Sequence, residues 1–373
     1  MRLYYRWLEK SRGFDWWLFL SGLILALTGL VAIYSIDLSR GEELNFFSTQ
    51  ILALAIGLVG FFVISFSHLA VFRSLAKLIY LFALVLLVLV LFLGINIRGT
   101  TGWFRLAGFS FQPAELAKAG LAIFLAWWTT KQARRFDRWQ YLLTSGFFAF
   151  VPCLLILFQP DLGSALILAG VWFGHLLLVG TKKRYLFSLV GIFIFVSLFS
   201  WFFLFADYQK ERLMTFVDPG RDPLGAGYNV AQSMIAIGSG QLLGRGLGFG
   251  SQSQLHFLPE AQTDFIFSVI AEELGFLGAF LILGLYFLLL VRLWYIARQM
   301  NDDFSAYLVL SILLLFFLQL VVNTGGALGL LPVTGVTLPF VSYGGSSLLI
   351  NFLLLGLAES AARSAVRLPS TTS

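Results

Sequence analysis

The 373-residue sequence is poor in charge, in cysteine and in histidine. Charged residues make up only 12% of the chain, whereas a soluble domain has about a quarter. Because Cys153 is the single cysteine, an intramolecular disulfide and a thiolate metal site are both excluded. His68, His175 and His256 lie far apart without the spacing of metal ligands, so the sequence does not indicate a histidine metal centre.

The chain is instead rich in apolar residues. They make up 59% of the chain, the mean hydropathy is +0.87, and apolar runs of about 20 residues, enough to cross a bilayer as a helix, recur throughout. The sequence therefore predicts an all-α polytopic membrane protein. In such a protein the net charge of +6 first reports topology, and it does not indicate a nucleic-acid partner.

We expect one membrane domain over residues 1–373, with ten spans and a main extracytoplasmic loop at 206–263 between the seventh and eighth. The spans are expected near 14–33, 46–67, 77–95, 113–130, 141–158, 162–180, 185–205, 264–291, 305–323 and 346–362. Placing both termini in the cytoplasm puts 17 of the 25 Lys and Arg residues inside, as the positive-inside rule requires. The polar segments then lie on the extracytoplasmic face, where we expect any chemistry.

The segment 256–275 places one carboxylate, Asp264, where a polar stretch runs into a long apolar helix. Two interpretations stay open. An acidic residue at a helix N-terminus is commonly a stabilising charge or cap, although Thr263 and the nearby Glu260 are alternative capping groups. A catalytic carboxylate would instead be partly desolvated.

Two further motifs carry polar groups at the starts of apolar runs. Gln112-Pro-Ala-Glu-Leu-Ala-Lys118 opens the fourth span, and its Glu115 and Lys118 share a helix face because they are three residues apart. They form either an ion pair that holds helices together or the lining of a substrate groove. Asp161, in the turn Gln159-Pro-Asp-Leu-Gly163, needs no role beyond turning the chain and capping the next helix.

The loop 323–347 is irregular and rich in glycine and proline. Its end, from Ser342 through Ser346 and Ser347, leads into the last helix, whose amides either cradle a phosphate or are simply capped. Another glycine-rich stretch, 238–250, is not a nucleotide-binding loop because no Gly-Lys-Ser/Thr sequence follows it. Arg212 and Arg245 are the cations of the long connection best placed to meet an anion.

Together these stretches resemble the SEDS family (shape, elongation, division and sporulation) over essentially the whole chain. The resemblance rests on Gln112-Pro-Ala-Glu-x-x-Lys118, Gln159-Pro-Asp-Leu-Gly163, Gly227-Tyr-Asn-Val-Ala-Gln-Ser233, Thr263-Asp-Phe-Ile-Phe267, Glu272-Glu-Leu-Gly275 and Leu338-Pro-Phe-Val-Ser-Tyr-Gly-Gly-Ser-Ser347. Asp207-Tyr-Gln-x-x-Arg212, Asp222-Pro-Leu-Gly-Ala-Gly-Tyr228 and Ser251-Gln-Ser-Gln-Leu255 look like the elongation branch, RodA, rather than the division branch, FtsW.

The resemblance implies a peptidoglycan glycosyltransferase of the bacterial cytoplasmic membrane that polymerises lipid II on the outer face during cell elongation. Its partners would be lipid II, the growing polyprenyl-pyrophosphate-linked glycan, a class B penicillin-binding protein transpeptidase and the elongation machinery. The family's essential acidic residue falls on Asp264, and the tryptophan before the fourth span falls on Trp103. The Glu and Lys of the Gln-Pro-x-Glu motif fall on Glu115 and Lys118.

Two residues depart from the family pattern. Gly102 stands where an arginine usually precedes the tryptophan, so a phosphate contact there is in doubt, with Arg98 or Arg105 as substitutes. Gln262 replaces the usual histidine before Thr263, which argues against a proton shuttle at that position.

For this chemistry Asp264 is the expected general base that takes a proton from the acceptor hydroxyl. Arg212, Lys118 and the helix start at Ser346 and Ser347 are the candidates for stabilising the pyrophosphate leaving group. A divalent cation, Mg²⁺ or Mn²⁺, bound partly by Asp264 is the alternative. The other two functions considered are a lipid II flippase and a non-catalytic scaffold for the transpeptidase.

Overall fold

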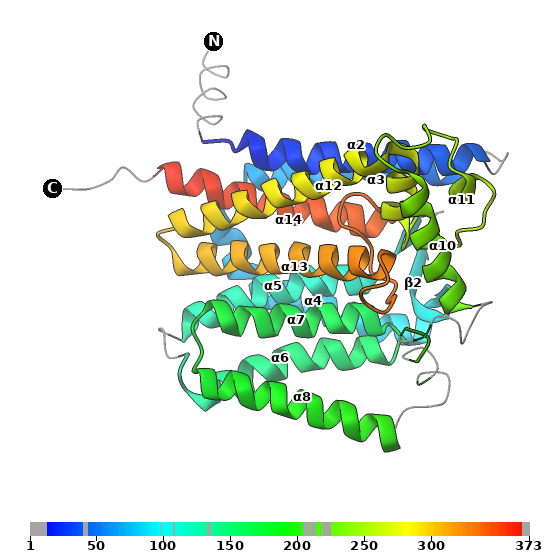
Figure 1. Cartoon of the computed structure of the whole chain (residues 1–373). Coiled ribbons are helices and arrows are strands. Elements are labelled where there is room, and N and C mark those ends of the chain that lie inside the picture. Colours follow the sequence, from blue (N-terminus) through cyan, green and yellow to red (C-terminus); the bar gives the residue numbers. More distant parts are fainter. Residues whose placement is uncertain are drawn as a thin grey trace, which may run out of the picture.

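The computed structural model describes residues 13–39, 44–97, 99–106, 109–132, 136–203, 210, 214–216, 218 and 225–367. Long helices run side by side as a bundle, with three short strands at one end (Figure 1). The end that carries the strands, α10 (Ala226–Ser239), α11 (Ser251–Gln254) and the loop 328–344 is called the loop end below. The first helix begins and the last helix ends at the opposite end.

The long helices follow the expected spans closely. They are α2 (Trp16–Ser39), α3 (Asn45–Ser65), α4 (Leu69–Leu93), α5 (Pro113–Lys131), α6 (Trp139–Leu157), α7 (Leu162–Leu178), α8 (Lys183–Phe203), α12 (Ile266–Gln299), α13 (Asp303–Ala327) and α14 (Gly345–Arg367). Eight of them, all but α5 and α7, are long and apolar enough to cross a membrane. The helix α7 has 17 residues and α5 contains the charged Glu115 and Lys118, so ten crossings remain a prediction.

Some helices extend past the expected apolar runs. The helix α4 begins at Leu69 rather than near 77, although its first turns contain Arg73 and Lys77. Arg73 lies 3.2 Å from Asp302, and the Lys77 ammonium lies 4.9 Å from the ring centre of Trp127. Long basic side chains can keep their charge at the membrane surface while the backbone stays helical. The predicted start of this span, which was based on hydrophobicity alone, therefore lies too far along the chain.

The connection between α4 and α5 forms a small antiparallel sheet. Its strands β1 (Ile95–Ile97), β2 (Thr100–Leu106) and β3 (Phe109–Phe111) lie in the order β1-β2-β3, with Ile95 opposite Trp103. The helical architecture is confirmed, but the description all-α misses this sheet. Alternating aromatic and β-branched residues favour strands in this polar segment.

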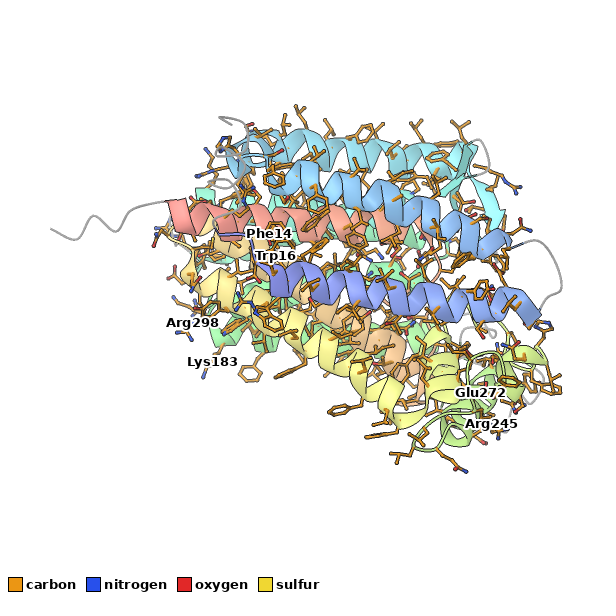
Figure 2. The ribbon with its side chains drawn as sticks, turned by 90° about the horizontal axis from the view of Figure 1, so that it is seen from above. Phe14, Trp16, Lys183, Arg245, Glu272 and Arg298 are labelled. Atoms are coloured by element: carbon orange, nitrogen blue, oxygen red, sulfur yellow. The ribbon has the colours of Figure 1, made fainter. Side chains whose placement is uncertain are left out.

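A break in α12 joins the bundle to the long connection. Gly275 has φ 67°, and a Cβ there would lie 2.2 Å from the amide nitrogen of Gly244. The connection replaces the interrupted helical hydrogen bonds, since Arg245 N–H donates to the Glu272 carbonyl and Phe276 N–H donates to the Gln241 carbonyl. Figure 2 labels Arg245 and Glu272 together at the loop end. The short helical segment that starts just after Asp264 is thereby tied to the loops around it.

Candidate active site

Asp264 lies in a turn immediately before α12. The turn is closed by three backbone amides, including that of Asp264, which all donate to the Glu260 carbonyl. The N-cap position of α12 is Phe265, which has no side-chain oxygen, so Asp264 precedes the cap rather than occupying it. Thr263 is also occupied elsewhere, because its hydroxyl donates to the backbone and side-chain oxygens of Glu260, each at 3.3 Å.

Asp264 is half-buried and lines a small open pocket between α12, α13 and the loop 328–344. The cavity itself has a volume of about 10 Å³, about what one water molecule needs. Asn323 on α13 also lines it and donates from Nδ2 to the Asp264 carbonyl at 3.1 Å and to the Val336 carbonyl at 2.8 Å. One side chain therefore fixes both the turn that carries the carboxylate and the loop that forms the opposite wall.

The loop before α14 is hydrogen-bonded to the same turn. The Ser342 hydroxyl donates to the Thr263 carbonyl at 2.6 Å and accepts from the Leu338 amide at 2.9 Å, while Tyr343 N–H donates to the Gln262 carbonyl. Gln262 and Ser342 are both buried. The structure therefore brings these residues together as parts of the frame around Asp264.

Gln50 on α3 holds this loop from its other side. Its Nε2 donates to the Ser342 carbonyl at 3.0 Å, and its Oε1 accepts from the Gly344 amide at 3.1 Å. The Gln50 amide thus donates to one backbone group of the loop and accepts from another, as the backbone of a neighbouring strand would. No motif containing Gln50 stands out in the sequence, where it follows Ser48 and Thr49 directly before an apolar run.

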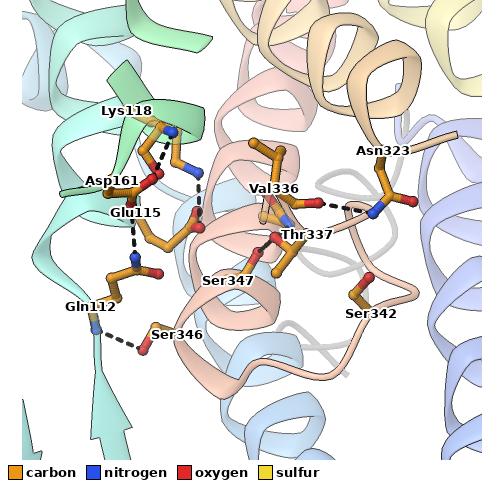
Figure 3. Close-up of polar contacts among 12 residues, drawn as sticks. Gln112, Glu115, Lys118, Asp161, Asn323, Val336, Thr337, Ser342, Ser346 and Ser347 are labelled. Atoms are coloured by element: carbon orange, nitrogen blue, oxygen red, sulfur yellow. Dashed lines mark hydrogen bonds and ion pairs between the residues drawn. The ribbon is translucent and has the colours of Figure 1, made fainter. Parts of the chain in front are cut away.

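Three separate sequence motifs meet beside α5. The Gln112 side chain donates to Asp161 at 3.2 Å, and its backbone amide donates to the Ser346 hydroxyl at 3.1 Å (Figure 3). Ser346 in turn donates to the Ser110 carbonyl at 2.8 Å. Asp161 is also the N-cap of α7, accepting from Ser164 N–H. The cap expected at Asp161 is present, and the same carboxylate links α5 to α7.

Glu115 and Lys118 form an ion pair 2.8 Å long whose side chains are only 5% and 2% exposed. Near them, the Ser347 hydroxyl lies 3.0 Å from Thr337 Oγ1 and accepts from Asn351 at 3.3 Å. In Figure 3 the ion pair and Asn323 lie on either side of the Thr337–Ser347 contact. The pair is internal, and whether it also meets a substrate stays a prediction.

The other residues predicted for the site lie on β2 or outside the described residues. Trp103 is half-buried on β2, where Gly102 packs against the Gln159 side chain, since a Cβ on Gly102 would lie 3.0 Å from its Oε1. Arg105 is exposed on β2. Arg212 lies outside the described residues, and so do Asp207, Tyr208, Gln209 and the segment 222–224 of the motifs that resemble the elongation branch.

A metal site at Asp264 would have to use neutral oxygen ligands. Within the described ranges no group of three or more His, Cys, Asp or Glu side chains could hold a metal ion. The other lining residues with side-chain oxygens are Asn323 and Thr334, and hard divalent cations accept amide and hydroxyl oxygens. Asp264 is the one carboxylate in this lining, and a divalent cation bound there stays a prediction.

The sequence alone did not assign Asn323, Gln50 or Gly163 to this region. Gly163 is needed because the loop backbone passes against it: a Cβ there would lie 2.3 Å from the Thr334 carbonyl oxygen. In the sequence, the only sign of this close approach was the glycine at the start of a helix.

Comparisons with known proteins agree with the resemblance. A family profile described as cell cycle protein, FTSW_RODA_SPOVE, matches residues 15–366. The probable peptidoglycan glycosyltransferase FtsW of Trichlorobacter lovleyi is 38% identical over 349 residues, which cover 90% of each chain. The peptidoglycan glycosyltransferase MrdB of Escherichia coli K12 is 37% identical over 342 residues, which cover 91% of this chain and 90% of that one.

Solved structures resemble the whole bundle. The rod shape determining protein RodA of Thermus thermophilus has a TM-score of 0.69 at 32% identity, covering 94% of this chain and 97% of that one. A chain from a structure described as coordinating polymerization and crosslinking in a peptidoglycan synthase complex has a TM-score of 0.80 at 33% identity. It covers 95% of this chain and 99% of that one.

Proposed function

Because the chain belongs to the FtsW, RodA and SpoVE family of cell cycle proteins, we propose that it polymerises lipid II into glycan strands. The named activity of its relatives makes it a glycosyltransferase of peptidoglycan synthesis, and its apolar helices make it a multi-pass protein of the inner membrane. We place both termini in the cytoplasm and the loop end outside, as the distribution of Lys and Arg requires.

The observation that carries the proposal is the position of Asp264. Its carboxylate is half-buried in an open pocket at the loop end, and its backbone is held by Asn323 and by the Glu260 turn. An acceptor hydroxyl is a poor nucleophile until a base within hydrogen-bond reach takes its proton. We assign that role to Asp264. A single displacement without an enzyme nucleophile inverts the anomeric centre.

The leaving group is a polyprenyl pyrophosphate, whose developing charge needs cations or amide donors. Lys118, Arg212 and the amides of Ser346 and Ser347 at the start of α14 are the groups we assign to it. The hydroxyls of Ser342 and Ser346 already donate to backbone carbonyls, so these serines support the loop more directly than they bind phosphate. A divalent cation at Asp264, if bound, supplies Lewis-acid charge stabilisation at the same position.

We further propose that the chain serves cell elongation together with a class B penicillin-binding protein. The elongation-type motifs support this branch, and a related chain comes from a peptidoglycan synthase complex. Among the relatives, FtsW and MrdB proteins are about equally similar to this chain, so the motifs and not the overall identity carry the assignment.

One reconstitution separates the candidate functions. The wild type and Asp264→Ala are purified, supplied with lipid II, and assayed with and without the cognate class B penicillin-binding protein. We expect glycan polymer from the wild type and none from the variant. Polymer that persists in Asp264→Ala would remove the catalytic assignment. Translocation of labelled lipid II in vesicles without polymer would indicate a flippase, and neither activity would indicate a scaffold.

A further inference from the structure

Two lysines on neighbouring helices converge on the ring of Trp127, at the end of the bundle opposite the loop end. The Lys77 ammonium on α4 lies 4.9 Å from the centre of this ring, and the Lys131 ammonium, at the last residue of α5, lies 5.9 Å from it. Both distances are within the range of a cation–π contact. Trp127 is half-buried, whereas both lysines are exposed, so two positive charges are gathered at one point on the surface.

The carboxylates described near these lysines pair with other cations. Asp302 lies 3.2 Å from Arg73, and Asp137 lies 3.1 Å from Lys182. In the part of the chain that the structure describes, neither of the two lysines forms an ion pair. Like charges held close together repel each other, so an anion bound between the two ammonium groups would stabilise this arrangement.

The two lysines lie at the edge of the lipid-facing surface. The helix α5 has 19 residues, which span about 28 Å, so Lys131 at its end lies near the border of a hydrocarbon core about 30 Å thick. Residues three and four apart share a helix face. On α4 the residues that follow Lys77 at this spacing are apolar and exposed, and they form the α4 stripe: Leu81, Val85, Val88 and Phe92.

We propose that Lys77, Trp127 and Lys131 bind the headgroup phosphate of an anionic phospholipid, with an acyl chain along the α4 stripe. Ammonium groups bind phosphate as point charges, tryptophan favours the boundary between lipid and water, and basic positions between helices on the cytoplasmic side bind anionic headgroups. The occupant is a lipid rather than a soluble anion because the stripe begins at the cations. The site is separate from the Asp264 pocket and goes beyond the proposed function, and the topology proposed above assigns the lipid to the inner leaflet.

The test is the binding of phosphatidylglycerol, compared with phosphatidylcholine that has the same acyl chains but no net charge. Native mass spectrometry of the protein in detergent, titrated with each lipid, gives the two dissociation constants. We expect the wild type to prefer phosphatidylglycerol. One basic side chain at a membrane surface strengthens the binding of an anionic lipid about fivefold. Lys77→Gln and Lys131→Gln should therefore each lower the preference about fivefold and together about 25-fold, whereas Lys77→Arg with Lys131→Arg should retain it.

Lys183→Gln is the matched control, because Lys183 is also an exposed lysine at this end of the bundle but lies on α8 (Figure 2). It should leave the preference unchanged, and glycerol phosphate, which carries the charge without acyl chains, should not displace phosphatidylglycerol. Thermal unfolding of the lipid-free variants should match the wild type, because the substituted lysines are exposed. A preference that survives the double glutamine change, or an equal loss in Lys183→Gln, would overturn the site. Displacement by glycerol phosphate at the concentration of the lipid would overturn the lipid as its occupant.

Discussion

The hydroxyl of Ser342 lies 2.6 Å from the carbonyl oxygen of Thr263, the residue before Asp264. Two segments nearly eighty residues apart in sequence are joined by this contact, and the same hydroxyl accepts from the Leu338 amide. The turn that carries the carboxylate is therefore held from outside α12. The position of Asp264 depends on the loop before α14 as much as on its own helix.

Ser342→Ala should lower both stability and catalysis. It removes the hydrogen bonds of the Ser342 hydroxyl with the Thr263 carbonyl and the Leu338 amide, at a cost of about 1–3 kcal/mol. A small displacement of Asp264 should lower kcat roughly 10- to 100-fold. Thermal unfolding in detergent and the initial rate of polymerisation measure the two effects.

Ser360→Ala is the matched control for Ser342. Ser360 is likewise buried, but it lies on α14. Its hydroxyl donates to the Ser67 carbonyl at 2.7 Å and so joins α14 to the turn that precedes α4. It should lose a similar amount of stability without the fall in kcat. Equal catalytic losses in both variants would show that the Ser342 contact acts only through global stability.

Gln50→Leu should weaken the same frame from α3. The substitution removes the donor to Ser342 and the acceptor for Gly344, so the free energy of unfolding should fall by about 1–3 kcal/mol. We expect polymerisation to fall with lipid II at saturation, because the geometry of the loop rather than substrate affinity is altered.

Gln319→Leu provides the comparison for Gln50. Gln319 on α13 is equally buried, but neither end of its amide has a hydrogen-bond partner among the described residues. Replacing it should be neutral or stabilising. If Gln319→Leu were as harmful as Gln50→Leu, the two contacts of Gln50 would not explain its effect.

The buried Glu115–Lys118 pair allows structural and catalytic roles to be separated. Removing either partner alone leaves a buried charge without its partner and should lower the free energy of unfolding by about 3–5 kcal/mol. The double change Glu115→Leu with Lys118→Met should recover most of this stability. If Lys118 stabilises the leaving group, the double variant folds but makes no polymer. A stable double variant with full polymerisation would limit the pair to holding α5 together.

The long helices could be predicted from the sequence because each one contains a long apolar run. The shared helix face of Glu115 and Lys118 was predicted correctly from their spacing, and so was the cap at Asp161. These features are local, and helix geometry determines them within a few residues.

Contacts between distant segments could not be predicted in this way. The pairing of Gln50 with the loop before α14, the two bonds of Asn323 and the approach of Thr334 to Gly163 each join elements far apart in the chain. The break of α12 at Gly275 was missed for the same reason, because its hydrogen-bond partners come from the long connection. Asp264 was expected near a helix cap, but the cap position falls on Phe265.

Asp264→Asn tests the central assignment most directly. The substitution nearly preserves size and leaves the backbone contact of Asp264 with Asn323 in place, but an amide cannot accept the proton of the sugar hydroxyl. We measure polymerisation of lipid II by the purified variant, together with its thermal unfolding and its equilibrium binding of lipid II. The account predicts a folded protein that binds lipid II and makes no polymer. Polymerisation near the wild-type rate would contradict it, and Asp264 would then be a positioning residue rather than the base.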